Sequence, residues 1–115
     1  MREILFKAKR LDNGEWVQGN VFFADNGKCE ICIGTPIVRI TYEVDPETVC
    51  QYAGLTDKNG VKIFEGDRLA DKYGDTGVVK FGWSYGTFGF FCDGTVDDIQ
   101  DKDLLVIGNI RDKTH

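Results

Sequence analysis

The sequence is almost without histidine: the only one is His115, the last of the 115 residues. A terminal residue is usually frayed, which makes it a poor catalytic base or metal ligand. The scarcity therefore excludes Ser-His-Asp and Cys-His nucleophilic sites, as well as zinc sites built from several histidines. Any catalysis would have to use carboxylates, lysine, tyrosine or cysteine.

Long apolar runs are missing as well. No stretch approaches the roughly 18 apolar residues of a membrane-spanning helix, and residues 1–7 (MREILFK) lack the apolar segment of a secretory signal. We therefore expect a cytoplasmic protein without a membrane partner. In that compartment the four cysteines should be reduced thiols. They are Cys29, Cys32, Cys50 and Cys92.

Positive charge is in deficit, since 14 Lys and Arg stand against 19 Asp and Glu, a net charge of −5. This balance excludes a protein that coats nucleic acid without specificity and argues against anionic membranes as partners. Five aspartates between 93 and 103, offset only by Lys102, form an acidic stretch that is typical of a solvated face.

Proline is also scarce, with 2 residues against 14 glycines, which favours many tight turns and hence a β-rich chain. Alternation of apolar and polar side chains predicts short strands, most clearly over 37–44. Residues 77–81 and 88–92 resemble the two strands of a hairpin. Residues 104–107 are apolar on both faces and are predicted to form an interior strand.

Two short helical turns are also expected. Asp45 can cap a turn that has Pro46 at its first position, and residues 95–98 resemble a capping box before a short helix. With 42% hydrophobic residues the chain can bury the core of one domain. We therefore predict a single all-β or β-dominated domain over 1–115, a small barrel or sandwich with one or two helical turns.

Three segments resemble the YopX family, whose members are small proteins encoded by bacteriophages and prophages. The most specific is residues 49–67 (VCQYAGLTDKNGVKIFEGD), which is similar to the family signature apart from mild departures at Cys50, Ala53 and Phe64. Residues 2–8 (REILFKA) and 106–110 (VIGNI) resemble the start and the ending of family members. The resemblance thus covers most of the chain.

The resemblance implies a fold rather than a reaction. It implies an SH3-type barrel core, which we place over 49–110, after the N-terminal β-hairpin region that the strand pattern predicts over 1–44. No activity comes with the resemblance, so no catalytic residue, metal or cofactor is assigned. Its motif residues are expected to be structural: Gly66 would permit a sharp entry into a strand, and Asp67 would accept hydrogen bonds from turn N–H groups. The motif residues are Gln51, Gly54, Asp57, Gly60, Glu65, Gly66, Asp67, Gly108 and Asn109.

Residues 81–92 hold six of the 14 aromatic residues and no charge. Some of these rings must face the core, with Phe88 and Phe90 on one side of the predicted strand. Trp83 and Tyr85 fall near a hairpin tip, where glycine-flanked aromatic side chains make good contact surfaces. We take Trp83, Tyr85 and Tyr52 as the candidate binding surface, with core packing as the alternative.

Two other clusters could carry chemistry. Cys29 and Cys32 form a C-x-x-C pair, but structural zinc needs four ligands, and cysteines three apart in a strand face opposite sides. Carboxylates near the family motif could act as acid and base or hold a metal ion. They also occupy turn sequences, where such side chains commonly accept backbone N–H groups. These carboxylates are Asp57, Glu65, Asp67 and Asp71.

Three function hypotheses follow. The first is a non-enzymatic phage or prophage accessory protein in a bacterial host cell, which binds a host or phage protein or a second copy of itself. The second is a carboxylate- or metal-dependent enzyme that uses Glu65 and Asp67. The third is nucleic-acid binding through Lys7, Lys9 and Arg10, against which the net charge argues.

Overall fold

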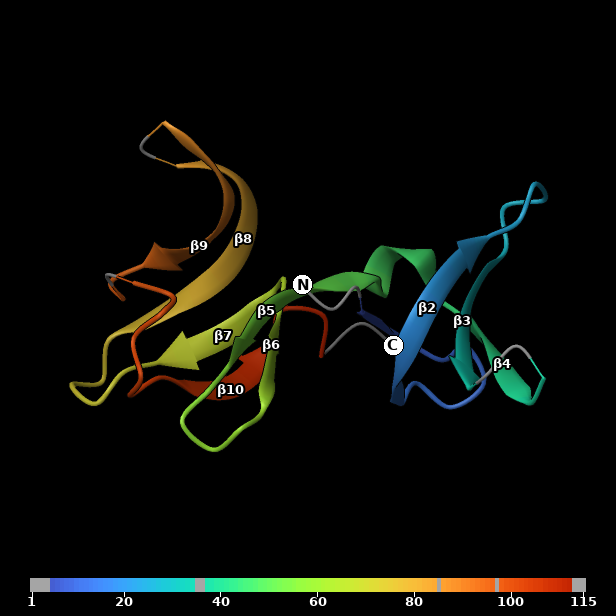
Figure 1. Cartoon of the computed structure of the whole chain (residues 1–115), viewed down its shortest axis with the longest axis horizontal. Helices are drawn as coiled ribbons and strands as arrows, with labels where there is room; N and C mark the ends of the chain where they lie inside the picture. Colours follow the sequence, from blue (N-terminus) through green and yellow to red (C-terminus); the bar gives the residue numbers. More distant parts are fainter. Residues whose placement is uncertain (1–4, 35–36, 85, 97, 113–115) are drawn as a thin grey trace. The chain divides into compact units, whose positions relative to one another are not determined.

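The computed structural model describes residues 5–34, 37–84, 86–96 and 98–112. Over these residues the chain is all-β, with ten strands and one 3-10 turn (Figure 1). The elements in chain order are β1 (Phe6–Lys9), β2 (Trp16–Phe23), β3 (Cys29–Gly34), β4 (Arg39–Val44), η1 (Pro46–Thr48), β5 (Cys50–Thr56), β6 (Lys62–Phe64), β7 (Asp67–Ala70), β8 (Thr76–Ser84), β9 (Thr87–Gly94) and β10 (Leu105–Asn109). Among the described residues, no helix has the length and apolar character to cross a membrane.

The chain divides into two compact units within β5. The first unit runs up to Tyr52, and the second begins at Ala53. The first residues of β5, Cys50 and Gln51, pair with β1, whereas the neighbour of β5 on its other side is β6. One strand therefore contributes to both units.

The first unit is an antiparallel sheet in which β1, β2, β3 and β4 lie side by side in sequence order. The pairs Cys29–Val44 and Ile31–Tyr42 place alternate side chains of β3 and β4 on one face. That face carries the core of the unit, which consists of Ala8, Cys29, Ile31 and Val44. The region predicted as a hairpin over 1–44 thus contains three consecutive hairpins, β1–β2, β2–β3 and β3–β4.

The turn predicted at Asp45 is confirmed. The Asp45 carboxylate accepts the N–H of Glu47 at 3.0 Å, and Pro46 occupies the first position of η1. The hydroxyl of Thr48 then accepts the N–H of Lys9 at 2.8 Å. Through this bond the turn connects to β1, which explains why Thr48 is fully buried.

The second unit is built on an antiparallel sheet in the order β10-β7-β8-β9. Its core consists of Ala53, Ile63, Leu69, Val79, Val96, Ile99 and Leu104. The SH3-type barrel expected over 49–110 is not confirmed, because the sheets do not close over the described residues. The confirmed fold class is all-β with two antiparallel sheets.

Two predictions for the second unit are wrong. The helix predicted after residue 95 is replaced by a turn, in which the Asp98 carboxylate accepts the N–H of Gln100 at 2.9 Å. A side chain that bonds to the backbone in this way competes with helix formation. In addition, β10 is an edge strand rather than an interior one, and Ile107 is exposed. A short apolar run cannot by itself distinguish these two positions.

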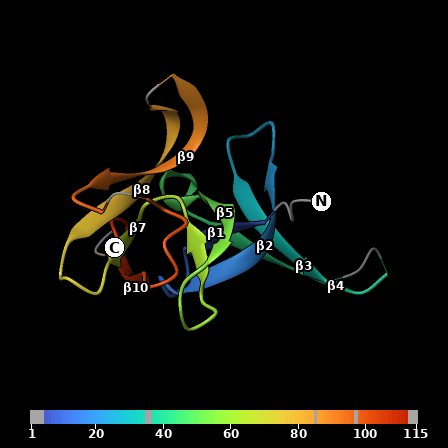
Figure 2. The same cartoon turned by 60° about the vertical axis from the view of Figure 1, so that its left-hand side comes forward.

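The β8–β9 hairpin extends beyond the rest of its sheet. β7 pairs only with the first residues of β8, Thr76 to Val78, whereas β9 follows β8 as far as the pair Ser84–Thr87. The far end of the hairpin is therefore a two-stranded ribbon, which curves away from β7 and β10 (Figures 1 and 2).

Candidate functional site

Four aromatic rings follow one face of this hairpin, and we call them the aromatic ladder. They are Phe81 and Trp83 of β8, and Phe88 and Phe90 of β9. The strand register pairs Phe81 with Phe90 and Trp83 with Phe88. Their ring centroids lie 4.6 and 5.3 Å apart, and Phe81 also meets Phe88 edge-on at 4.9 Å. These are favourable aromatic geometries, so the rings support one another.

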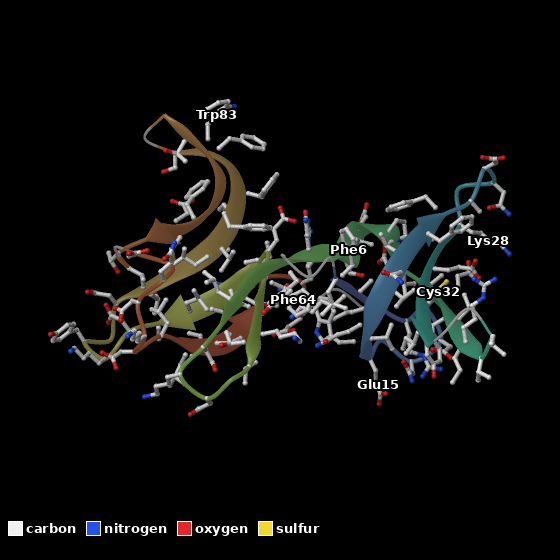
Figure 3. All side chains as sticks on the ribbon, viewed as in Figure 1. Phe6, Glu15, Lys28, Cys32, Phe64 and Trp83 are labelled. Atoms are coloured by element: carbon white, nitrogen blue, oxygen red, sulfur yellow. The ribbon has the colours of Figure 1, made fainter. Side chains whose placement is uncertain are left out.

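The ladder passes from the core into solvent. Phe90 packs against the core of the second unit, whereas Phe81 is 42% exposed, Phe88 54% and Trp83 72%. Trp83 lies at the far end of the hairpin (Figure 3). A contiguous exposed aromatic surface of this kind commonly marks an interaction site.

The structure exposes a different set of residues from the one predicted for the candidate binding surface. Trp83 is exposed, as an interaction residue must be, and Tyr85 lies outside the described residues. Tyr52 is wrong as a surface residue, because it is buried in β5 with 7% of its surface exposed. The sequence interpretation missed the exposure of Phe81 and Phe88. A two-residue turn after Ser84 would have placed Phe88 opposite Trp83 and so indicated the ladder.

The motif carboxylates hold the second unit together. Asp57 follows β5, and its Oδ1 accepts the N–H groups of Asn59 and Val61, each at 2.9 Å. Its Oδ2 accepts the N–H of Val106 in β10 at 3.0 Å. Burial alone would raise the pKa of Asp57, but these three backbone N–H groups favour the carboxylate and the pKa is lowered. Asp57 thus connects the turn after β5 to the edge strand β10.

The lowered pKa of Asp57 predicts a pH-dependent contribution to stability. A carboxyl group whose pKa is lower in the folded state stabilises the fold above its unfolded value, here 3.8, and loses that contribution as the pH falls through the folded value. We expect Asp57→Asn to lower the free energy of unfolding by about 1–3 kcal/mol at pH 7, and the difference from the parent to shrink below pH 3.8. Urea unfolding at a series of pH values measures both quantities.

A matched control is Asp71→Asn. Asp71 also accepts two turn N–H groups, from Tyr73 and Asp75 at 2.9 Å, but it is half-buried, and these bonds are exposed to solvent and stay within its own turn. Its replacement should cost less than about 1 kcal/mol. An equal loss for both variants at pH 7 would contradict the role assigned to the Asp57–Val106 bond.

Asp67 forms the second connection. It is fully buried at the start of β7, where its Oδ2 accepts the N–H of Phe64 at 2.7 Å. Its Oδ1 accepts the side-chain N–H of Asn109 at 2.8 Å. The expectation that Asp67 accepts a turn N–H is confirmed, and the bond to Asn109 adds a link to β10 that the sequence did not indicate.

Gly66 lies between these groups and completes the network. Its φ of 85° is in the left-handed region that glycine adopts without strain. Its N–H donates to the carbonyl of Val79, and its carbonyl accepts the N–H of Ile110, at 2.8 and 2.9 Å. The two family segments, 49–67 and 106–110, are therefore hydrogen-bonded to each other through Asp57, Gly66 and Asp67.

The other motif residues lie at turns, in strands or beside the network. Gln51 pairs with Phe6, and Gly54 and Gly60 have positive φ. Glu65 is half-buried, and its carbonyl lies 3.4 Å from the Asn109 side-chain nitrogen. Gly108 lies where the register of β10 against β7 shifts. These placements give the motif a structural explanation.

Two of the candidate carboxylates and two of the cysteines have structural surroundings that can be described. The oxygens of Asp57 and Asp67 are engaged by N–H groups, and no three side chains in the described part of the chain are placed to hold a metal ion. Cys29 is buried in β3, and Cys32 is half-buried three residues further along the same strand. Burial, assisted by the charge of Glu30, raises the pKa of Cys29 and favours its neutral thiol.

The three cations considered for nucleic-acid binding pack against neighbouring side chains to different extents. Lys9 is only 4% exposed, and its ammonium group lies over the ring of Trp16, as does that of Lys7. Arg10 donates to the Asp12 carboxylate at 2.9 Å and covers the ring of Tyr42. Each of these cations thus has an aromatic or acidic neighbour within the first unit, and binding of nucleic acid through them stays a prediction.

The fold and the ladder define a class: a small all-β protein with two antiparallel sheets and an exposed aromatic hairpin. The chain belongs to the YopX family, since the family model described as YopX protein matches residues 6–114. It is also similar to the crystal structure of protein EF1440 from Enterococcus faecalis, with 23% identity and a TM-score of 0.59. That match covers 100% of this chain and 98% of the other, and shows a shared fold. A comparison with curated proteins finds none that matches.

Proposed function

We propose that this chain is a non-enzymatic protein-interaction module whose contact surface is the aromatic ladder. The exposure of Trp83 and Phe88 carries the proposal, because large aromatic side chains at the surface are the residues that most often dominate protein interfaces. The partner class is a protein of the phage or of its host, met in the cytoplasm of a bacterial cell, and the chain acts there as a phage or prophage accessory protein.

The rest of the molecule suits a scaffold for this surface. The carboxylates of Asp57 and Asp67 accept hydrogen bonds from backbone N–H groups and from the Asn109 side chain, which suits a structural role. The SH3-type arrangement that the family resemblance implies over 49–110 belongs to the same proposal, since small barrels commonly serve as rigid supports for contact surfaces. The hairpin extends from this support and presents its rings to solvent.

Affinity capture tests the proposal. Tagged chain is incubated with nuclease-treated lysate of a phage-susceptible bacterium, and bound proteins are read by mass spectrometry. The variant Trp83→Ala with Phe88→Ala should recover a specific partner at least about tenfold less well than the parent, because interface aromatics are typical hot spots. Tyr73→Ala is the control, since Tyr73 is 78% exposed in the β7–β8 turn, away from the ladder.

Circular dichroism should show the same far-ultraviolet spectrum for all three proteins, because the replaced side chains are exposed. Capture that survives the double replacement would place the contact surface elsewhere. Equal loss in the Tyr73→Ala control would mean that the effect is not specific to the ladder.

A further inference from the structure

We infer that the partner of the aromatic ladder is a second copy of this chain, packed ladder against ladder about a two-fold axis. The inference rests on the proposed function for the identity of the contact surface and goes beyond it by naming the occupant. Three observations support it: the far part of the hairpin has only two strands in the described part of the chain, its aromatic rings are exposed, and residues 81–92 carry no charge.

The far part of the hairpin lacks a third strand. β7 ends its pairing with β8 at Val78, so that in the described part of the chain the ribbon from Phe81 to Phe90 consists of two strands. An isolated two-stranded ribbon is marginally stable in water and needs a further layer against its apolar face. A second ladder provides such a layer.

The exposed area fits a modest homodimer. Taking roughly 200 Å² for a fully exposed aromatic residue, the exposures of Phe81, Trp83 and Phe88 leave about 340 Å² of ring surface on each copy. Two copies would bury about 700 Å² through these rings alone, and neighbouring residues of the hairpins add to this. The area of these rings alone is below the roughly 1,200 Å² at which standard specific interfaces begin, so we expect a weak dimer that forms only as the protein concentration is raised.

The absence of charge on the ladder favours an equally uncharged partner surface over a charged one. Residues 81–92 carry no charge, so two ladders can meet without opposing like charges. The rings also match themselves, because each offers both an edge and a face to a neighbour, and identical patches associate naturally through a two-fold axis. The net charge of −5 opposes association only at longer range.

This charge balance predicts an unusual salt dependence. Added salt screens the repulsion between two acidic chains and should strengthen the dimer, whereas it would weaken a complex with a basic partner. Sedimentation velocity of the full chain, from low micromolar to several hundred micromolar, measures the dissociation constant of the dimer at each salt concentration. We expect a concentration-dependent dimer whose dissociation constant falls as NaCl is raised from about 50 to about 500 mM.

Charged replacements within the ladder locate the interface. Trp83→Glu and Phe88→Glu should each weaken the dimer at least about 30-fold, the effect of losing one interface hot spot. Tyr73→Glu adds the same charge to an equally exposed aromatic position outside the ladder and should leave the dissociation constant within about threefold of the parent. Far-ultraviolet circular dichroism checks that each variant is folded.

The outcomes separate this inference from the proposed function. A chain that stays monomeric at all concentrations overturns the inference, even if its ladder captures another protein. A dimer that survives both ladder replacements overturns it as well. Ladder-dependent dimerisation without capture of a second protein supports the inference and removes the phage or host partner from the proposed function.

Discussion

Replacing Asp67 with alanine is expected to lower the free energy of unfolding by about 3–5 kcal/mol. The side chain is fully buried and accepts the N–H groups of Phe64 and of the Asn109 amide. Without it, two donors in the interior lose this acceptor, and each such loss costs about 1–3 kcal/mol. Urea unfolding followed by circular dichroism gives the difference directly.

Two further variants assign the loss to these bonds. Asp67→Asn keeps an acceptor oxygen and nearly the same volume, so it should cost less than Asp67→Ala. A double-mutant cycle with Asn109→Ala should show a coupling energy of about 1–3 kcal/mol, because the two side chains are in contact. A loss below about 1 kcal/mol for Asp67→Ala would show that the site relaxes around the change.

Gly94→Ala should lower the free energy of unfolding by about 2–4 kcal/mol. A Cβ atom at this position would lie 2.5 Å from the carbonyl oxygen of Thr76 and 2.6 Å from the Cα of Gly77. Both atoms belong to the backbone of the facing strand, so neither can move aside cheaply. The φ of 151° adds strain for any residue with a side chain.

Gly82→Ala is the matched control in the same hairpin. No atom lies within 4 Å of the position that its Cβ would occupy, and Gly82 has no positive φ. The replacement should be neutral or stabilise by up to about 1 kcal/mol, because alanine restricts the unfolded chain. Thermal unfolding of the two variants side by side compares them. Similar melting temperatures would refute the steric argument at Gly94.

Local patterns predicted most strands and the turn at Asp45, because alternation and capping depend on residues close in sequence. These local patterns gave wrong predictions where contacts between residues distant in sequence determine the structure. Val96 and Ile99 are buried in the core of the second unit without a helix around them. The edge position of β10 follows from its pairing with β7, a contact across more than thirty residues that no local signal contains.

The residues of the candidate site also differ in how far local sequence could predict them. Trp83 could be recognised from its place near a hairpin tip, whereas the exposure of Phe88 follows from the register of β9 against β8. The burial of Lys9 was missed for a related reason, since Lys9 packs against Trp16 of the neighbouring strand. Charge along a sequence does not show which side chains a folded sheet covers.

The bonds between the two family segments also constrain when the second unit can fold during synthesis. Asp57 and Asp67 need partners at Val106 and Asn109, which follow them by 49 and 42 residues in the chain. Pairings of this sequence separation form slowly, since a long loop must close before they contribute. A nascent chain that ends before β10 cannot complete this network, so the second unit reaches its native state only after β10 has been synthesised.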